Sequence, residues 1–476
     1  MSGPRRVLLT GATGNWGRAA LRELADRGDR FEVTALVLEG KREREAIAEF
    51  EGMASLRVVY GDLTDYATVE SCVRGADYVL HLGALVSPMA DDRPDEAWRI
   101  NVGSARNIVR AVHAQPDPGA VGVVMVGSVA ETGGRPPPHH WGRVGDPVRV
   151  SRYDEYGQSK VAAERLVVDS GLPRWVWLRQ TAMFHPGIVE IRDPIMTHMP
   201  LGDAMEWVSD TDSARLLANI CEGEAPEDFW CRVHNIGGGE SWRLTNWEML
   251  ARLAGAMGVK DVRRWYDRDW FATRNFHGHW HADSDLLEEL VPFRRDSFES
   301  ALERAVRSAP ARVRHAGRVP AAIVKRLVMK PLTLEPRGTM SFVRDHDEAR
   351  VRAYFGSRRE WELIGDWVTF APPRPSRTPR SLDHGYDESK ASGEWTRADL
   401  ADAADFRGGE LLSERFEPGR VGGPLRWRCA EGHEFDGSPR LILRCGHWCP
   451  TCVRDPAGYA RQAVRNQFLA QLDPPG

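Results

Sequence analysis

The sequence lacks the features that would assign it to a membrane, secreted or nucleic-acid-coating class. No apolar run approaches the ~18 residues of a transmembrane helix, so we expect no membrane partner. The net charge of −4 over 476 residues gives no whole-protein reason to bind nucleic acid or an anionic membrane. The first apolar segment starts almost at once and leaves no room for a signal peptide, so we expect a cytoplasmic protein.

Cysteine is scarce and unevenly distributed. Of seven cysteines, Cys72, Cys221 and Cys231 are scattered, and the other four crowd together near the C-terminus. In a chain with no secretion signal, such a crowd is more typical of metal ligands than of disulfides. The length gives room for two or three domains, because a domain usually takes about 100–200 residues.

A glycine-rich turn follows the first apolar run. Residues 7–9 (VLL) precede residues 10–17 (TGATGNWG), and a helical pattern begins at Arg18. This order predicts a phosphate loop, because glycines let backbone N–H groups approach a pyrophosphate and a helix N-terminus favours negative charge. The spacing is G-x-x-G-x-x-G rather than G-x-G-x-x-G, so the alternative is a glycine turn with no ligand.

Apolar segments alternate with helical patterns over the first half of the chain. Runs typical of buried parallel strands lie at residues 31–38, 56–60, 78–84 and 121–128, with a helical pattern at 101–109 between the last two. The alternation predicts an α/β fold with a Rossmann-like, doubly wound parallel sheet and helices on both faces.

A tyrosine and a lysine lie four residues apart where a later helical pattern begins. This spacing places Tyr156 and Lys160 on one face of a helix. An ammonium beside a phenol favours the phenolate, so we expect a Tyr156 pKa below its usual value of about 10. Such a tyrosine can exchange a proton with a carbonyl or alcohol oxygen, which Ser128 could also hold. The alternative is a surface pair.

Together these motifs resemble an extended short-chain dehydrogenase/reductase of the NAD-dependent epimerase/dehydratase type over residues 5–308. The matching positions are residues 10–17, 61–63, 81–84, 101–103, 128, 156–160 and 178–181. The resemblance implies hydride transfer at nicotinamide C4 and a catalytic set of Ser128, Tyr156 and Lys160. The cofactor-binding set is Gly11, Thr13, Gly14, Asn15, Trp16, Gly17, Asp62, Leu63, Gly83, Ala84, Tyr156 and Lys160.

The resemblance also implies separate roles within this set. Asp62 would bind the adenine amine, Gly83 and Ala84 would line the cofactor, and Lys160 would hold the nicotinamide ribose. The preference between NAD and NADP stays open, because Val37 and Leu38 occupy the usual place of an acidic residue. Glu39 could serve NAD. A 2′-phosphate could be met by Lys41, Arg42 and Arg44.

Two departures from the family narrow the expected reaction. Sugar-nucleotide dehydratases usually follow the active-site hydroxyl residue with an Asp-Glu pair, whereas Val129 and Ala130 follow Ser128. Sugar-nucleotide epimerases often carry an asparagine where this chain has Phe184. We therefore favour an NAD(P)-dependent oxidoreductase acting on a small-molecule alcohol or ketone. The alternatives are an NAD-dependent sugar epimerase and a non-catalytic cofactor-sensing or recognition protein.

The second half of the chain is expected to divide into smaller parts. Residues 180–308 would form the small substrate-binding part of domain 1–308. A linker helix packed on its own domain is expected in residues 309–336, in preference to a membrane-surface helix. A connecting region at 337–395, with a proline-rich stretch at 370–379, and a C-terminal helix or tail at 457–476 flank a module at 396–456.

Histidine and cysteine patterns give two candidate metal sites of unequal strength. His277, His279 and His281 alternate as in a strand, and we expect them to line a cleft or pair locally rather than hold a metal. The stronger pattern combines C-x3-H with C-x2-C, four ligands in two close pairs, as tetrahedral structural zinc requires. Its members are Cys429, His433, Cys449 and Cys452.

The segment around these four ligands, residues 396–452, resembles zinc-ribbon and treble-clef modules. Such modules often accompany nucleases and other nucleic-acid proteins. Cys445 and His447 could each replace one ligand, and free thiols in a small core are the alternative to zinc. We expect the module to pack on the dehydrogenase domain or to shape its substrate entrance. The expected partner is a small-molecule substrate. A nucleic acid could bind only through the zinc module. If the chain forms an oligomer, we expect a homodimer.

Overall fold

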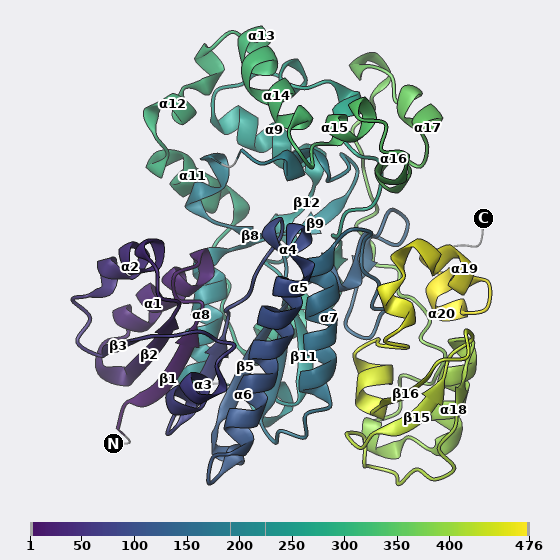
Figure 1. Cartoon of the computed structure of the whole chain (residues 1–476). Coiled ribbons are helices and arrows are strands. Elements are labelled where there is room, and N and C mark those ends of the chain that lie inside the picture. The colour runs from purple at the N-terminus through teal and green to yellow at the C-terminus, as the bar shows by residue number, and fades with distance from the viewer. Residues whose placement is uncertain (1–2, 191, 224, 474–476) are drawn as a thin grey trace.

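The computed structural model describes residues 3–190, 192–223 and 225–473. Figure 1 shows a central sheet domain, a helical lobe above it and a C-terminal module beside it. No helix among the described residues is both long and apolar enough to cross a membrane.

A seven-stranded parallel sheet forms the centre of the molecule. Its order is β11-β7-β5-β4-β1-β2-β3, so the chain crosses from one half of the sheet to the other after β3. This arrangement confirms the predicted Rossmann-like sheet. The strands are β1 (Arg5–Thr10), β2 (Phe31–Val37), β3 (Leu56–Tyr60), β4 (Tyr78–His81), β5 (Gly122–Ser128), β7 (Trp175–Gln180) and β11 (Arg232–Ile236).

Helices cover both faces of this sheet, and the alternation of side chains along each strand explains how. In β1, Val7 and Leu9 join the core beneath α1 and α8, whereas Leu8 joins the core beneath the helices of the other face. The first face carries α1 (Asn15–Asp26) and α8 (Asp210–Cys221). The second carries α3 (Tyr66–Val73), α6 (Gly103–His113) and α7 (Glu155–Val168).

Short elements complete the sheet domain and connect it to the upper lobe. The helices are α2 (Lys41–Ile47), α4 (Met89–Asp92), α5 (Pro94–Ala97) and α10 (Ser284–Leu290). The short strand pairs are β6 (Trp141–Gly142) with β13 (Trp280–His281), β8 (Met183–Phe184) with β10 (Val208–Ser209), and β9 (Ala204–Glu206) with β12 (Arg243–Thr245).

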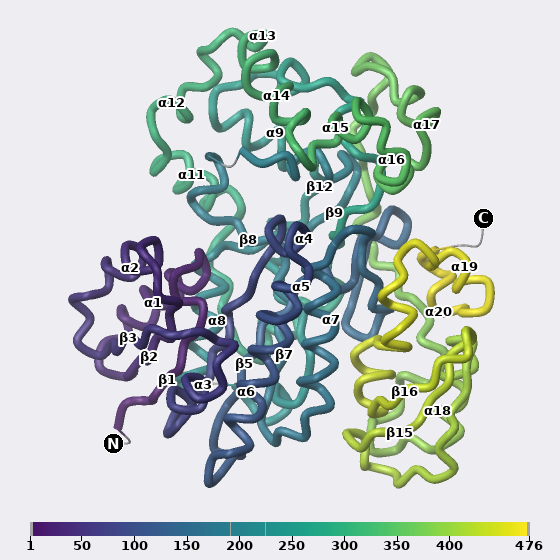
Figure 2. The backbone as a smooth tube through the Cα atoms, viewed as in Figure 1, coloured from purple at the N-terminus to yellow at the C-terminus, as the bar shows by residue number. Residues whose placement is uncertain are grey.

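The upper lobe has a core of its own, which runs from Leu201 to Phe370 in the chain. Its packed residues therefore extend well past position 308, and the expected linker and connecting region contribute helices to the lobe (Figure 2). The helices are α9 (Asn246–Ala256), α11 (Phe298–Ser308), α12 (Ala311–Arg314), α13 (Ala321–Val324), α14 (Lys330–Leu334), α15 (Thr339–Arg344), α16 (Glu348–Phe355) and α17 (Arg358–Glu362).

The C-terminal module consists of a small antiparallel sheet and short helices around buried Trp395 and Trp427. Figures 1 and 2 both place it beside α7 of the sheet domain. Its Leu441 and Cys445 belong to the same apolar core as α7. The module therefore packs on the sheet domain, which is one of the two arrangements expected from the sequence. Its elements are α18 (Arg397–Phe406), β14 (Glu410–Leu411), β15 (Leu425–Arg428), β16 (Glu434–Gly437), α19 (Tyr459–Ala463) and α20 (Gln467–Ala470).

Candidate active site

The glycine loop passes so close to the end of β4 that side chains are excluded from it. Gly11 has φ of 70°, and a Cβ there would lie 2.7 Å from the Gly83 nitrogen. A Cβ on Gly17 would overlap the carbonyl oxygen of Gly11. The loop thus folds as a tight cradle between β1 and α1, as its sequence predicts.

The first turn of α1 fits an anionic group. Gly14 is the N-cap and supplies no capping side chain, and the first turn contains no acidic residue. The N–H groups at this end therefore have no side-chain acceptor, and the helix dipole favours negative charge beside them. This end of α1 can hold the pyrophosphate of a dinucleotide.

Residues at the ends of β1, β3 and β4 gather around the loop. Thr10 Oγ1 accepts a hydrogen bond from the Gly83 N–H at 3.1 Å and lies 2.9 Å from His81 Nδ1. A Cβ on Gly83 would meet Leu63, which places the ends of β1, β3 and β4 together. Asp62 accepts hydrogen bonds from the Thr64 N–H and hydroxyl, at 2.8 and 2.9 Å. The structure therefore brings Gly11, Leu63 and Gly83 together, although they lie far apart in sequence.

Glu39 and Arg44 follow β2, where the sequence left the choice of dinucleotide open. Their side chains form an ion pair at 2.8 Å, and both are largely exposed. Charges of both signs thus stand next to each other just beyond this strand end.

The three proposed catalytic residues come from the end of β5 and the start of α7. Asp154 caps α7 and accepts a hydrogen bond from the Gly157 N–H at 2.7 Å, which fixes the first turn. Tyr156 lies on that turn, and Nζ of Lys160, one turn further along the helix, lies 5.9 Å from the centre of its phenol ring. Lys160 Nζ donates to the Val126 carbonyl at 2.8 Å, which ties α7 to β5.

The expectation that the Tyr156 pKa is lowered is wrong for the protein by itself: its pKa is raised. Burial raises the pKa of this phenol above its usual value, and the neighbouring Ser128 hydroxyl only partly offsets the rise. Burial lowers the pKa of Lys160 to about 8. Tyr156 is therefore protonated at neutral pH and can donate a proton to an oxygen placed beside it.

A buried acid behind Ser128 escaped the sequence analysis. The Glu131 carboxyl accepts a hydrogen bond from the Ser128 N–H at 2.7 Å and forms a capping box with it. The Ser-x-x-Glu spacing was the signal that could have revealed it. Burial and the adjacent Glu164 raise the pKa of Glu131 well above its usual value.

An ion-pair network extends from Glu131 into the C-terminal module. Arg179 binds both carboxylate oxygens of Glu164, at 2.9 and 2.6 Å, and lies 3.5 Å from Glu131. His447 of the module lies 2.9 Å from Glu164, and the Cys445 carbonyl accepts a further hydrogen bond from Arg179 at 2.9 Å. All of these side chains are buried. The module thus contacts α7 directly.

The predicted zinc ligands converge in the C-terminal module. The ligand atoms of Cys429, His433, Cys449 and Cys452 all lie within 4.8 Å of one another. Cys429 Sγ is 3.7 Å from Cys452 Sγ, close to the ~3.8 Å expected when two sulfurs each bind one tetrahedral zinc. No other such group occurs among the residues that the structure describes. Cys445 and His447 are instead engaged with the α7 network.

The three histidines near residue 280 do not form a metal site. His277 lies 3.1 Å from Asp154, and His279 lies 2.9 Å from the Thr132 hydroxyl. Only His281 belongs to a strand, the two-residue β13, so the expected longer strand with three histidines on one face does not form. The first two histidines pair locally, as the alternative to metal binding anticipated.

The fold and the cradle define a dinucleotide-binding α/β domain. Residues 7–187 match the model of the NAD dependent epimerase/dehydratase family, so this part of the chain carries a domain of that family. The fold agrees: dTDP-glucose 4,6-dehydratase from Bacillus anthracis, solved in complex with NAD, superposes with a TM-score of 0.51 at 14% identity. That similarity covers 64% of this chain and 96% of the dehydratase.

Curated relatives match a shorter stretch. Sterol demethylase protein B of Methylococcus capsulatus is 30% identical over 174 residues, which is 34% of this chain and 46% of the relative. UDP-glucose 4-epimerase of Rickettsia massiliae is 28% identical over 111 residues, 22% of this chain and 32% of the relative. The matched stretch thus spans less than half of either relative.

Proposed function

We propose that this protein is an NAD(P)-dependent oxidoreductase of the short-chain dehydrogenase/reductase type that acts on a small-molecule alcohol or ketone. The observation that carries the proposal is the convergence of Ser128, Tyr156 and Lys160 where β5 and α7 meet. Tyr156 is half-buried, and its raised pKa keeps it protonated, as a proton donor to a carbonyl oxygen must be.

The cofactor would lie between the glycine cradle and this catalytic set. The uncapped N-terminus of α1 would hold its pyrophosphate, and Asp62 and Gly83 would contact its adenosine half. When bound, the nicotinamide supplies or accepts the hydride. Glu39, beyond β2, would accept a hydrogen bond from the ribose 2′-hydroxyl. Because the matching family model is described as NAD dependent, we propose NAD as the preferred form; a smaller dissociation constant for NADP than for NAD would reject it.

The chain's own residues would handle the proton. The Ser128 hydroxyl would hold the substrate carbonyl oxygen, and the Tyr156 hydroxyl would donate its proton to that oxygen as the alcohol forms. The positive charge of Lys160 would stabilise the phenolate left behind. In the reverse direction the same phenolate would accept the alcohol proton.

Substitution of Tyr156 by phenylalanine tests this mechanism. We expect Tyr156→Phe to lower kcat for NAD(P)H-dependent reduction by roughly 10²–10⁴-fold, because the ring remains and only the transferable proton is lost. Activity would be found first with a panel of ketones and aldehydes, followed by the absorbance of the reduced nicotinamide. Tyr153→Phe is the matched control, because its phenol is 43% exposed and carries no proposed role. Full activity in Tyr156→Phe would reject the mechanism.

Two structural observations favour this reaction over epimerisation and dehydration. Phe184, where epimerases often carry an asparagine, is buried against Trp242 and Phe298 and faces the core. Glu131 is the first acid after Ser128, and its carboxyl is occupied behind the site. Epimerisation is the second candidate, because one relative of this chain is a UDP-glucose 4-epimerase. NAD that copurifies tightly and shows no net turnover would support it.

We propose further that Cys429, His433, Cys449 and Cys452 bind a structural zinc ion. Four protein ligands would close the coordination sphere, so the ion would stabilise a module too small to rely on its own core. Cys449→Ser should lose zinc, measured by atomic emission, and should lower the melting temperature. Cys231→Ser is the control, because this half-buried thiol lies outside the cluster. Full zinc content and unchanged melting in Cys449→Ser would reject the site.

A further inference from the structure

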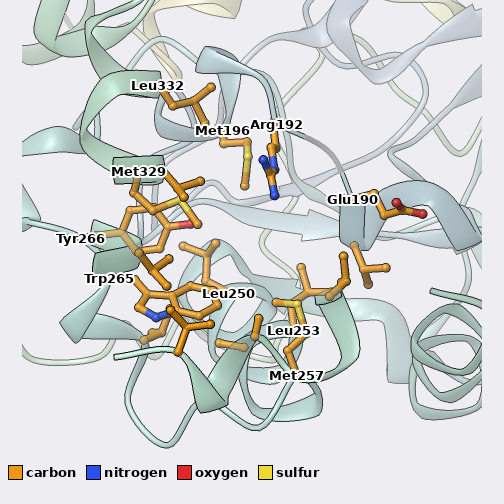
Figure 3. Close-up of a pocket in the computed structure, with 18 of the residues that line it drawn as sticks. Glu190, Arg192, Met196, Leu250, Leu253, Met257, Trp265, Tyr266, Met329 and Leu332 are labelled. Carbon is orange, nitrogen blue, oxygen red and sulfur yellow. The ribbon is translucent and has the colours of Figure 1, made fainter. Parts of the chain in front are cut away.

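The upper lobe contains a large apolar cavity whose lining includes none of the proposed catalytic residues. Its volume is about 660 Å³. One wall contains Leu250 and Leu253 of α9 and Met257 just after it, and Met329 and Leu332 lie on the opposite wall (Figure 3). Val328, next to Met329 in the chain, also lines the cavity. The cavity therefore lies between the lobe proper and the basic helices that follow position 310.

The size of this cavity is not that of a packing defect. Protein interiors are close-packed and contain few voids larger than a water molecule. A volume of this order, with mainly apolar walls and few polar groups, is typical of a site for a small organic molecule. The six wall residues named above are only half-buried, so this apolar surface lacks the full cover that a core would give it.

A polar side chain inside the apolar wall points to a ligand with an oxygen of its own. Tyr266 is only 5% exposed, and Figure 3 shows its hydroxyl turned into the cavity. No described residue forms a hydrogen bond with this hydroxyl. Because the hydroxyl reaches the cavity, a hydroxyl or carbonyl group on a bound ligand would find a hydrogen-bond partner there.

The charged residues of the lining are one glutamate and two arginines, Glu190, Arg192 and Arg312. Figure 3 shows the guanidinium of Arg192 extending toward the cavity, while the Glu190 carboxylate turns away. Glu190 lies 3.4 Å from Arg312, whereas no carboxylate of the described residues lies within ion-pair distance of Arg192. An anionic group at the cavity mouth would therefore find an available arginine.

We propose that this cavity binds an amphipathic anion, an elongated apolar molecule with an oxygen function for Tyr266 and a carboxylate or similar group for Arg192. Burial of the apolar body would supply most of the affinity. The molecule could be the substrate of the proposed oxidoreductase or a separate ligand. Ile188 and Val189 of the lining follow His185, whose ring lies 3.3 Å from Asn15 of the glycine cradle, so a short chain segment links the cavity lining to the cradle.

Equilibrium binding of two fluorescent probes to the full chain tests the proposal. The probes are cis-parinaric acid, an anionic fatty acid, and uncharged N-phenyl-1-naphthylamine. Both should bind the wild type saturably. Leu253→Trp fills the cavity and should weaken both by at least about tenfold, equal to ~1.4 kcal/mol. Leu286→Trp, at a leucine that is 57% exposed, should leave both unchanged. If Leu253→Trp does not fold, Leu332→Trp on the opposite wall carries the same test.

The role of Arg192 is tested with the same two probes. Arg192→Gln should weaken the fatty acid about fivefold, as expected for a solvent-exposed ion pair, and leave the uncharged probe unchanged. Arg359→Gln, at an exposed arginine of α17, is the control. Absence of saturable binding to the wild type, or equal binding to every variant, would overturn the proposal.

A final measurement identifies the source of the ligand. Displacement of the bound probe by a molecule that the enzyme turns over would assign the cavity to the substrate. Simultaneous binding would assign it to a separate ligand, and both results uphold an amphiphile site. Because binding is measured without turnover, failure of the proposed oxidoreductase activity would leave this test intact.

Discussion

Burial shifts the pKa values of the two ionisable residues of the proposed catalytic pair, Tyr156 and Lys160, in opposite directions. It raises the pKa of Tyr156 and lowers that of Lys160 to about 8, because a low-dielectric site disfavours the phenolate and the ammonium alike. The nearby Glu131 acts on both groups in one direction, because its negative charge raises the pKa of Tyr156 and of Lys160. Near neutral pH the pair therefore consists of a protonated phenol and a mostly charged lysine, which suits reduction of a carbonyl.

The pH dependence of reduction should report Lys160 rather than Tyr156. We expect kcat to fall above pH of about 8, because the lysine then loses the charge that stabilises the developing phenolate. Lys160→Arg keeps its charge at every accessible pH, so its slower reaction should lack this decline. The test compares kcat of the wild type and of Lys160→Arg from pH 6 to pH 10. The same decline in Lys160→Arg would assign the titration to another group.

Among the elements, β1, the glycine loop and α1 depend most on exact residue size. The loop touches α1 at one end and the end of β4 at the other, and glycine is required at both contacts. A methyl group at Gly17 would meet the Gly11 carbonyl oxygen, which must then move. Since the same loop would hold the pyrophosphate, its distortion should impair both stability and cofactor binding.

Gly17→Ala tests this dependence. We expect it to destabilise the fold by about 1–3 kcal/mol, the usual cost of overpacking, and to weaken NAD binding by at least about tenfold. Denaturant unfolding and calorimetric titration measure the two effects. Gly103→Ala is the control: a Cβ there would meet no atom within 4 Å, and alanine favours the helix that begins at this residue. Equal behaviour of the two variants would contradict the proposed cradle.

Elements defined by local pattern could be predicted, whereas contacts between distant segments could not. Alternating apolar runs and the order of glycine loop and helix depend on neighbouring residues, so the sheet and the cradle followed from the sequence. Glu131, Arg179 and His447 lie far apart in the chain, and only the folded structure unites them. The predicted direction of the Tyr156 pKa shift was wrong for a related reason. Helical spacing placed Lys160 near the phenol but gave no measure of how far the phenol is buried.

At the scale of the whole molecule, α7 is the element that the parts share. Its N-terminal half carries Tyr156 and Lys160. Further along the helix, Glu164 and Arg165 contact the C-terminal module. Burial alone would raise the pKa of Glu164, but the charge of Arg179 lowers it, so Glu164 remains ionised and needs its partners. The C-terminal module thus supplies one of the groups that hold α7 in place.

His447→Leu removes that support without touching the four cysteine and histidine ligands of the proposed zinc site. We expect a loss of about 1–3 kcal/mol in unfolding free energy, because Glu164 loses a buried hydrogen-bond partner. We also expect lower kcat and faster hydrogen exchange along α7, with unchanged zinc content. His447→Gln retains an N–H donor and should recover part of each effect. If stability falls while kcat and exchange in α7 stay at wild-type values, the module stabilises the fold without positioning α7.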